Sequence, residues 1–298
     1  MQKTILDRVE RVADDVVSLV LRGDEGPLAP WEPGAHVDLA LPNWLTRQYS
    51  LCGDPGDLSA YRIAVRHDPL SRGGSEYVHL YLRPGRTLEV SLPRNHFPLE
   101  PAPEYLFLAG GIGITPLVSM LRTAVETGAT ATLVYVGRSL TTMPFAEDLR
   151  RAYGDRVRLV ATAERGRPDF GALEPGPDAL VYCCGPAPML TAAEAVFPLV
   201  HAERFQPTRR VFGPDTAFEV VCARSGQTIQ VPPDESLLDA LTHAGRPVPS
   251  ACREGVCGSC ELAVLSGEPE HRDDIGAPTG RMYACVSRAL SPQLVLDV

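Results

Sequence analysis

Four cysteines near the end of the chain constrain its fold more than any other feature. Cys252, Cys257 and Cys260 lie in the run CREGVCGSC, with four and then two residues between them. Cys285 follows 25 positions after Cys260, directly behind the run RMYA. The tail of the chain must therefore fold so that three thiols of one loop meet a fourth thiol from a separate strand.

The spacing indicates what these thiols hold. The pattern C-x4-C-x2-C…C is that of plant-type [2Fe–2S] clusters. Gly255 and Gly258 let the loop approach such a cluster closely and turn backbone N–H groups toward sulfur. The alternatives are a zinc site or paired disulfides, but structural zinc sites usually use two short C-x2-C pairs, and only one occurs here. The spacing favours the iron–sulfur cluster, which accepts one electron at a time.

Size and composition limit the rest of the chain. At 298 residues, two or three domains are expected, and the net charge of −9 argues against nucleic acid as a partner. No apolar run reaches the ~20 residues of a membrane span, and the opening MQKTILDRVERVADD is no signal peptide. A reducing cytoplasm is therefore predicted, in which the remaining cysteines act as small buried hydrophobes: Cys52, Cys183, Cys184 and Cys222.

Three segments follow one another along the chain. Residues 1–100 contain short predicted strands at 15–22, 36–41 and 62–66, separated by proline-rich bends. Apolar and polar residues alternate along these strands, which favours an antiparallel barrel or sandwich. Residues 101–208 alternate buried strands with helices, which indicates an open parallel sheet. After a linker over 206–215, residues 215–298 carry a predicted β-hairpin, a short helix and the cysteine loop. The fold class is thus a multidomain α+β chain.

Two motifs in the first segment suit a flavin. Arg47-Gln-Tyr-Ser-Leu51 offers a guanidinium for phosphate, a flat ring for the isoalloxazine and a hydroxyl for a flavin nitrogen. Ser71-Arg-Gly-Gly-Ser75 precedes a predicted helix over 76–82, where free backbone N–H groups and a hydroxyl suit an anion. Each motif alone is weak; their order before the later glycine-rich and cysteine motifs makes the set informative.

The second segment contains signals for a nicotinamide nucleotide. Gly110-Gly-Ile-Gly-Ile-Thr-Pro116 follows a strand and opens a helix, although it is not a strict G-x-G-x-x-G. Cys183-Cys-Gly-Pro186 ends another strand at the same edge of the sheet. Arg138 and Ser139, at the end of a third strand, suit a 2′-phosphate and therefore slightly favour NADPH over NADH. Arg138 also suits stacking on adenine, which leaves NADH open.

The chain resembles the phthalate dioxygenase reductase family, which includes vanillate demethylase reductases and the reductase parts of self-sufficient cytochromes P450. The stretches that carry the resemblance are RQYSLC, GGS, SLPRNHFPL, LAGGIGITPLVSML, VYCCGPAPML, CREGVCGSC, GEPEHRD and CVSRA. The resemblance spans the whole chain. It implies an antiparallel Greek-key β-barrel for the flavin, an α/β parallel-sheet nucleotide domain and a β-grasp [2Fe–2S] ferredoxin domain, with FMN favoured over FAD.

The resemblance also implies residue roles. Arg47 and Ser75 would hold the flavin phosphate, Tyr49 and Ser50 would address the flavin ring, and Phe205 would close its edge. Thr115 and Cys184 would flank the nicotinamide, so that Ser50, Thr115 and Cys184 form the predicted catalytic set. The predicted cofactor-binding set is completed by Gln48, Ala64, Val65, Arg66, Gly73, Gly74, Gly110, Gly111, Gly113, Arg138, Ser139 and Gly185.

The expected activity is that of an NAD(P)H:acceptor oxidoreductase. A hydride passes to FMN, and single electrons leave through the cluster to a terminal oxygenase, either a Rieske-type enzyme or a cytochrome P450. Two other functions are open at this point: an electron carrier without flavin, and a redox sensor that responds through its cluster without turning over NAD(P)H. Neither nucleic acid nor a membrane is an expected partner.

Overall fold

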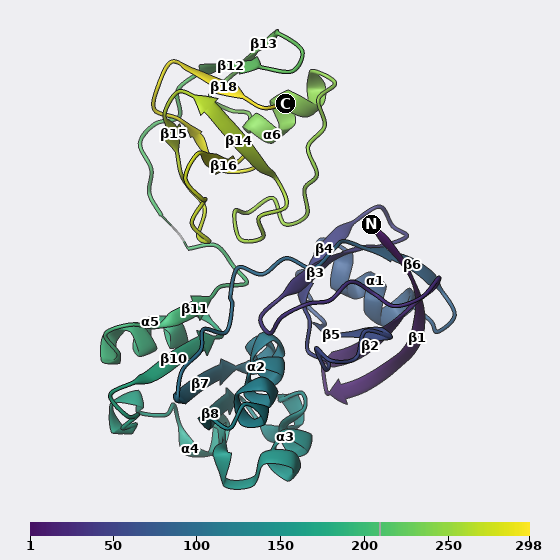
Figure 1. Ribbon diagram of the computed structural model, residues 1–298, viewed down its shortest axis with the longest axis vertical. Coiled ribbons are helices and arrows are strands. Elements are labelled where there is room, and N and C mark those ends of the chain that lie inside the picture. The colour runs from purple at the N-terminus through teal and green to yellow at the C-terminus, as the bar shows by residue number, and fades with distance from the viewer. Residues whose placement is uncertain (209) are drawn as a thin grey trace. The chain divides into compact units, whose positions relative to one another are not determined.

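The computed structural model describes residues 1–208 and 210–298. The chain divides by its internal contacts into two compact units, Met1–Arg204 and Phe205–Val298 (Figure 1). The predicted linker over 206–215 falls in the second unit. Each unit is described by itself below.

The first half of the first unit is a six-stranded antiparallel sheet in the order β4-β3-β6-β1-β2-β5. Its end strands β4 and β5 lie near each other without forming a ladder, as in an incompletely closed barrel. The core is formed by inward side chains such as Leu19, Leu39 and Ile63. The elements are β1 (Gln2–Ala13), β2 (Val16–Gly23), β3 (His36–Ala40), β4 (Thr46–Ser50), β5 (Ala60–Arg66), α1 (Gly74–Tyr81) and β6 (Thr87–Val90).

Strand β1 was not predicted from the sequence. Its many charged residues mask the alternation, yet Thr4 and Leu6 are fully buried while Asp7 and Arg8 face solvent. Two register shifts, between Leu6 and Arg8 and between Arg11 and Ala13, interrupt its pairing with β2. Such irregularities increase the local twist and help a sheet to curl.

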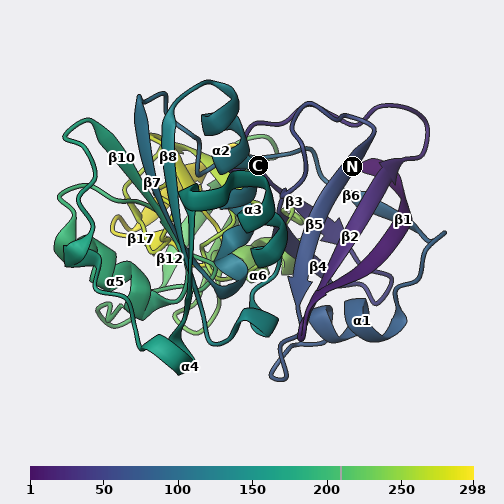
Figure 2. The ribbon, with the colours of Figure 1, turned by 90° about the horizontal axis from the view of Figure 1, so that it is seen from below.

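The second half of the first unit is a five-stranded parallel sheet in the order β11-β10-β7-β8-β9. Helices α2 and α3 cover one face and α5 the other (Figure 2). The chain enters at the central strand β7, so the direction of winding reverses between β7 and β10. The elements are β7 (Glu104–Gly110), α2 (Ile114–Glu126), β8 (Thr130–Gly137), α3 (Ala146–Tyr153), β9 (Val157–Ala161), α4 (Thr162–Arg165), β10 (Ala179–Cys184), α5 (Ala187–Val196) and β11 (His201–Glu203).

The second unit is a five-stranded mixed sheet in the order β13-β12-β18-β14-β16, with β12 and β18 parallel and the helix α6 packed on it. Ser236 is the N-cap of α6, because its hydroxyl accepts a hydrogen bond from the Asp239 N–H. The elements are β12 (Phe218–Cys222), β13 (Gln227–Val231), α6 (Leu237–His243), β14 (Glu261–Ser266), β15 (Pro269–Glu270), β16 (Arg281–Tyr283), β17 (Arg288–Ala289) and β18 (Gln293–Leu296). The predicted fold class is confirmed in all three parts.

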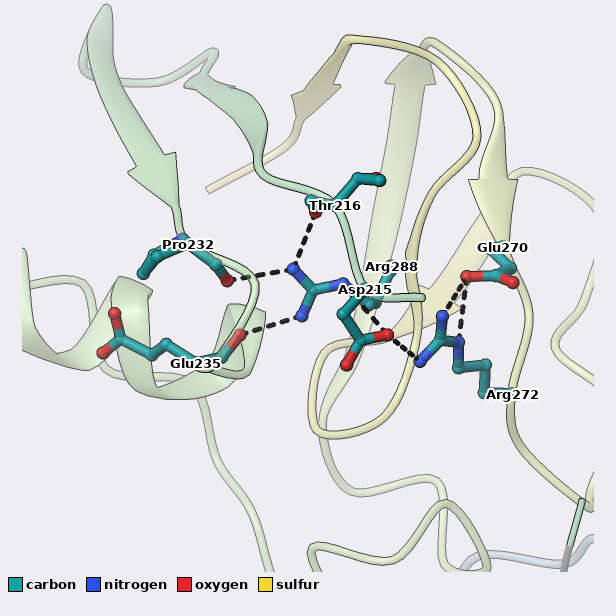
Figure 3. A network of polar contacts seen from close by, with 7 residues as sticks. All are labelled: Asp215, Thr216, Pro232, Glu235, Glu270, Arg272 and Arg288. Atoms are coloured by element: carbon teal, nitrogen blue, oxygen red, sulfur yellow. Dashed lines mark hydrogen bonds and ion pairs between the residues drawn. The ribbon is translucent and has the colours of Figure 1, made fainter. Parts of the chain in front are cut away.

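An arginine network fastens the beginning of the second unit to its body (Figure 3). Arg288 is 6% exposed and donates hydrogen bonds to the carbonyls of Thr216, Pro232 and Glu235 at 2.9, 2.9 and 3.0 Å. Beside it, Arg272 donates to both Asp215 and Glu270. A buried guanidinium that satisfies three carbonyls holds the segments that carry them in one arrangement.

We expect Arg288→Leu to lower the free energy of unfolding of the second unit by roughly 3–5 kcal/mol, because three part-buried carbonyls lose a charged donor that is itself buried. Denaturant unfolding of the purified protein, followed by the cluster absorbance, measures this loss. Arg281→Leu is the matched control, since Arg281 is exposed and its ion pair with Glu261 spans 3.5 Å. Equal stability of the two variants would contradict a structural role for Arg288.

Candidate functional site

The four cysteines of the predicted cluster site are set by one loop and one strand of the second unit. Cys257 and Cys260 are almost fully buried, whereas Cys252 and Cys285 are partly exposed. The first three belong to the loop that precedes β14, and Cys285 follows β16 after a single alanine. A partly exposed rim suits a centre that must exchange electrons with another protein.

Backbone N–H groups of the loop point at the sulfurs. The N–H of Glu254 donates to Cys252 Sγ at 3.3 Å, and that of Ser259 donates to Cys257. The turns that produce this arrangement need left-handed backbone, and Gly255 has φ 72°. A Cβ on Gly255 would lie only 3.1 Å from the Cα of Asp273, so the loop also needs glycine there for packing.

The thiols themselves interact. Hydrogen bonds from Cys257 and Cys285 lower the pKa of Cys252, and a hydrogen bond from Cys285 lowers the pKa of Cys260. Across residues 1–208 and 210–298, no three His, Cys, Asp or Glu side chains are arranged as a ready site for a metal ion. The pairwise thiol contacts nevertheless place all four sulfurs together, and sulfur donors with N–H groups aimed at them fit a [2Fe–2S] cluster.

The carboxyl edge of the parallel sheet in the first unit brings two glycine-rich turns together. A Cβ on Gly113 would lie 2.3 Å from the Cys184 carbonyl oxygen, and a Cβ on Gly185 would lie 3.0 Å from the Gly110 Cα. The turns after β7 and β10 thus touch through backbone at the point where the winding reverses. Open α/β sheets bind their ligands at this point.

A cavity of about 340 Å³ opens at the same edge. Gly110 and Gly111 line it after β7, and Gly137 and Arg138 line it at the end of β8. Pro186, Pro188 and Met189, in and after the predicted turn over 183–186, form another wall, and three further lining residues were not singled out from the sequence: Thr162, Arg167 and Phe170. The volume lies in the range of small-molecule sites.

Other predicted nicotinamide residues are buried or engaged in local bonds. Thr115 is 2% exposed and donates from its hydroxyl to the Ile112 carbonyl at 3.0 Å. Cys184 is fully buried, and burial raises the pKa of its thiol well above the ordinary value. The Ser139 hydroxyl bonds Thr142 and caps a short 3₁₀ helix. The catalytic and nucleotide roles of these residues stay predictions.

Glu203 is a polar group that sequence reasoning missed. It ends β11 opposite Cys184, whose thiol lies 3.9 Å from Glu203 Oε2. The surrounding protein raises the pKa of this carboxyl to about 8, chiefly through burial. Only the parallel pairing of β10 with β11 could have revealed it, because the two residues lie in separate strands.

We expect the first unit to lose stability as the pH rises from about 5 to 8, because the folded state keeps the Glu203 proton that the unfolded state releases. Glu203→Gln should flatten this dependence in denaturant unfolding measured across that range. Glu147→Gln, an exposed change on α3, is the control. An unchanged slope in the Glu203 variant would show that this carboxyl ionises normally.

The predicted flavin residues lie on the two end strands of the barrel and on the turn that starts α1. Arg47 to Ser50 make up most of β4. A Cβ on Gly74 would lie 2.6 Å from Arg47 Nε, so the guanidinium rests against the first turn of α1. Tyr49 packs on the barrel core, and burial raises the pKa of its hydroxyl.

The turn before α1 is held in shape by its neighbours. Gly73 has φ 90°, and its carbonyl accepts a hydrogen bond from Asn43 Nδ2 at 3.2 Å, a contact that sequence reasoning missed. The Ser75 hydroxyl accepts from the Asp68 N–H at 3.1 Å. On β5, Ala64 and Val65 are buried while Arg66 is exposed. The structure thus brings Arg47, Gly74 and the Gly73 turn together.

Three further predicted residues lie apart from these contacts. Ser50 is 6% exposed and pairs with His36 of β3, and Gln48 pairs with Asp38 on the same ladder. Phe205 opens the second unit and is 40% exposed. Its predicted role at the flavin edge, like the flavin roles of the other residues, stays a prediction.

Comparison with known proteins assigns two of the domains. Residues 107–195 match the family model of the oxidoreductase NAD-binding domain, and residues 220–290 match that of the 2Fe-2S iron-sulfur cluster binding domain. The fold and these sites define an oxidoreductase that joins a pyridine-nucleotide domain to an iron–sulfur domain. In the part of the chain that the structure describes, no helix has the length and apolar character needed to cross a membrane.

Similarity over the full length narrows the class. Phenoxybenzoate dioxygenase subunit beta of Ectopseudomonas oleovorans is 43% identical over 96% of this chain and 94% of its own. The solved structure of phthalate dioxygenase reductase superposes with a TM-score of 0.74. Its sequence is 35% identical, and the match covers 99% of this chain and 97% of that chain. An intact type IV self-sufficient cytochrome P450 monooxygenase is 39% identical with a TM-score of 0.91, but this chain spans only 41% of its length. The chain belongs to the phthalate dioxygenase reductase family of oxygenase reductases, as its sequence predicted.

Proposed function

We propose that the protein is the reductase component of an oxygenase system: it oxidises NAD(P)H at a bound FMN and delivers single electrons through a [2Fe–2S] cluster to a terminal oxygenase. Full-length similarity to oxygenase reductases is the observation that carries the proposal. The proposed domains are residues 1–100 for the flavin, 101–208 for the nucleotide and 215–298 for the cluster, in a protein that works in the cytoplasm.

The chemistry comes from the bound groups: a flavin takes a hydride from a nicotinamide, and an iron–sulfur cluster carries electrons singly. The chain supplies binding and orientation. Arg47, whose guanidinium lies against Gly74, would pair with the flavin phosphate, as would Ser75, one residue further on. Tyr49 is half-buried against the barrel core, and its ring would pack on the flavin.

The nucleotide domain would bind its ligand by letting it approach the backbone of a glycine-rich turn closely. Gly110 and Gly111 line the cavity where a pyrophosphate would approach the backbone, and Gly113 lets the turns after β7 and β10 meet beside it. Thr115 and Cys184 stay neutral beside this point and shield it from water. On the cluster side, Cys252, Cys257, Cys260 and Cys285 hold the irons, with N–H groups aimed at their sulfurs.

The experiment that tests this function uses the purified protein. Its flavin is extracted and identified by chromatography, its iron and sulfide are assayed, and its rates of cytochrome c reduction with NADH and NADPH are measured. Bound FMN, a cluster and rapid nucleotide-dependent reduction of cytochrome c are expected. An intact cluster without flavin would favour a simple electron carrier, and absence of NAD(P)H turnover would favour a redox sensor.

The terminal partner is proposed to be a Rieske-type oxygenase or a cytochrome P450, because a dioxygenase subunit and a cytochrome P450 monooxygenase both occur among the similar proteins. A candidate oxygenase of each kind, mixed with the reductase and NAD(P)H, should form product only when the reductase is present. Failure with both kinds, while cytochrome c is still reduced, would leave the reductase chemistry intact and overturn the partner assignment.

A further inference from the structure

The cavity at the edge of the parallel sheet is positively charged on one side. Arg138, at the end of β8, and Arg167, after α4, both line it, and no aspartate or glutamate does. Apart from Thr162, its other lining residues are glycines and apolar residues such as Phe170 and Met189. Two arginines in the lining of a cavity that no carboxylate lines favour a ligand that carries negative charge at that end.

Both guanidinium groups are available to such a ligand. Among the described residues, neither Arg138 nor Arg167 has a hydrogen-bond or ion-pair partner for its side chain. The two segments that carry them are tied together, because the Ala163 N–H donates to the Arg138 carbonyl at 3.0 Å. The nearest acid in sequence, Asp169, accepts a hydrogen bond from the Gly171 N–H at 2.9 Å and does not line the cavity.

The position of the two arginines within the sheet indicates which end of a nucleotide they face. Gly110 and Gly111 at the end of β7 mark the place for a pyrophosphate, where the winding reverses. From there one side of the cavity runs past the end of β8 to the segment after β9, and the start of α5, after β10, forms another wall. An adenosine that runs in this direction brings its ribose toward Arg138 and Arg167, while Phe170 and Met189 offer apolar surface to the base.

We propose that Arg138 and Arg167 form a binding site for the 2′-phosphate of NADPH, so that the protein prefers NADPH to NADH. The proposal rests on the proposed function, because it concerns the nucleotide of the same site. An acidic side chain here would accept hydrogen bonds from the free ribose hydroxyls of NADH and would repel a 2′-phosphate. Two arginines do the opposite, since each guanidinium can form paired hydrogen bonds with phosphate oxygens.

The test compares the nucleotides in the flavin- and cluster-loaded protein. We expect kcat/KM for NADPH to exceed that for NADH, and the ratio of the two to fall by about ten- to a hundredfold in Arg138→Ala and in Arg167→Ala. Arg165→Ala is the matched control: this exposed arginine lies two residues from Arg167 but outside the cavity, so its ratio should match the unmodified protein. A preference for NADH, or unchanged ratios in the first two variants, would overturn the proposal.

A binding measurement separates this proposal from the proposed function. Adenosine 2′,5′-bisphosphate and AMP carry no nicotinamide, so their affinities, measured by calorimetry, do not depend on hydride transfer. The bisphosphate should bind more tightly than AMP, and Arg167→Ala should remove the difference. Tight bisphosphate binding without NAD(P)H oxidation would contradict the reductase activity alone, whereas equal affinities in an active enzyme would contradict the arginine site alone.

Discussion

Replacing Cys257 with serine is expected to abolish NAD(P)H-dependent reduction of cytochrome c while flavin reduction by NAD(P)H continues. Cys257 is 1% exposed, accepts a hydrogen bond from the Ser259 N–H and is hydrogen-bonded to the Cys252 thiol. A serine hydroxyl is a much poorer ligand for iron than a thiolate. The cluster should therefore be lost or severely impaired, and electrons should remain on the flavin. Stopped-flow absorbance follows flavin reduction, and steady-state assays follow cytochrome c.

The control for this variant is Cys222→Ser, the same chemical change in the same unit. Cys222 is fully buried at the end of β12, outside the cysteine loop. The variant should lose some stability but keep its cluster and its cytochrome c activity. If Cys257→Ser stopped flavin reduction as well, in protein that is folded and loaded with flavin, the proposed order of electron transfer would be wrong.

The second large effect is expected at Gly113, where the turns after β7 and β10 meet. An added Cβ would lie 2.3 Å from the Cys184 carbonyl oxygen and 2.9 Å from the Gly185 nitrogen. Both are backbone atoms, so the turns must move apart to make room. A displacement of about 1 Å at a reacting centre can cost a hundredfold in rate. We therefore expect Gly113→Ala to slow flavin reduction by NAD(P)H by about a hundredfold and to cost about 1–3 kcal/mol in unfolding free energy.

Gly213→Ala provides the matched control, because an added Cβ there would meet no atom within 4 Å. This variant should reduce its flavin at the unmodified rate. Stopped-flow mixing with saturating NADH and NADPH measures both variants. A Gly113 variant with the unmodified rate would show that this turn tolerates a side chain, and that the close approach of the two turns is not needed for hydride transfer.

Much of the fold could be predicted because its signals are local. The strand at 157–161 and the hairpin strands at 218–222 and 226–231 have periodic or continuous apolar patterns, and the structure places β9, β12 and β13 there. Strand β1 was not predicted, because its charged residues lie on the outer face of a curved ladder. They obscure the alternation that the inward-facing Thr4 and Leu6 belong to. Alternation is weak evidence where a strand is long and interrupted by register shifts.

The candidate site was predictable only where its residues form motifs. The cysteine loop and the glycine turns carry their chemistry in a short run of sequence. Arg167 and Glu203 do not lie in such a motif. Arg167 lies on the segment that a hydrogen bond between Ala163 and Arg138 ties to the end of β8, and Glu203 meets Cys184 through strand pairing. Asn43 likewise reaches Gly73 from another turn. Contacts between segments distant in sequence depend on how strands pair, which a single sequence does not specify.

The central claim is that electrons from NAD(P)H reach the cluster by way of the flavin. An anaerobic titration of the purified protein with NADPH, followed by visible absorbance and by electron paramagnetic resonance, tests it most directly. We expect the flavin bands to bleach and the signal of a reduced [2Fe–2S] cluster to grow as nucleotide is added. Flavin that bleaches while the cluster stays oxidised, or protein that binds neither group after anaerobic reconstitution, would contradict it.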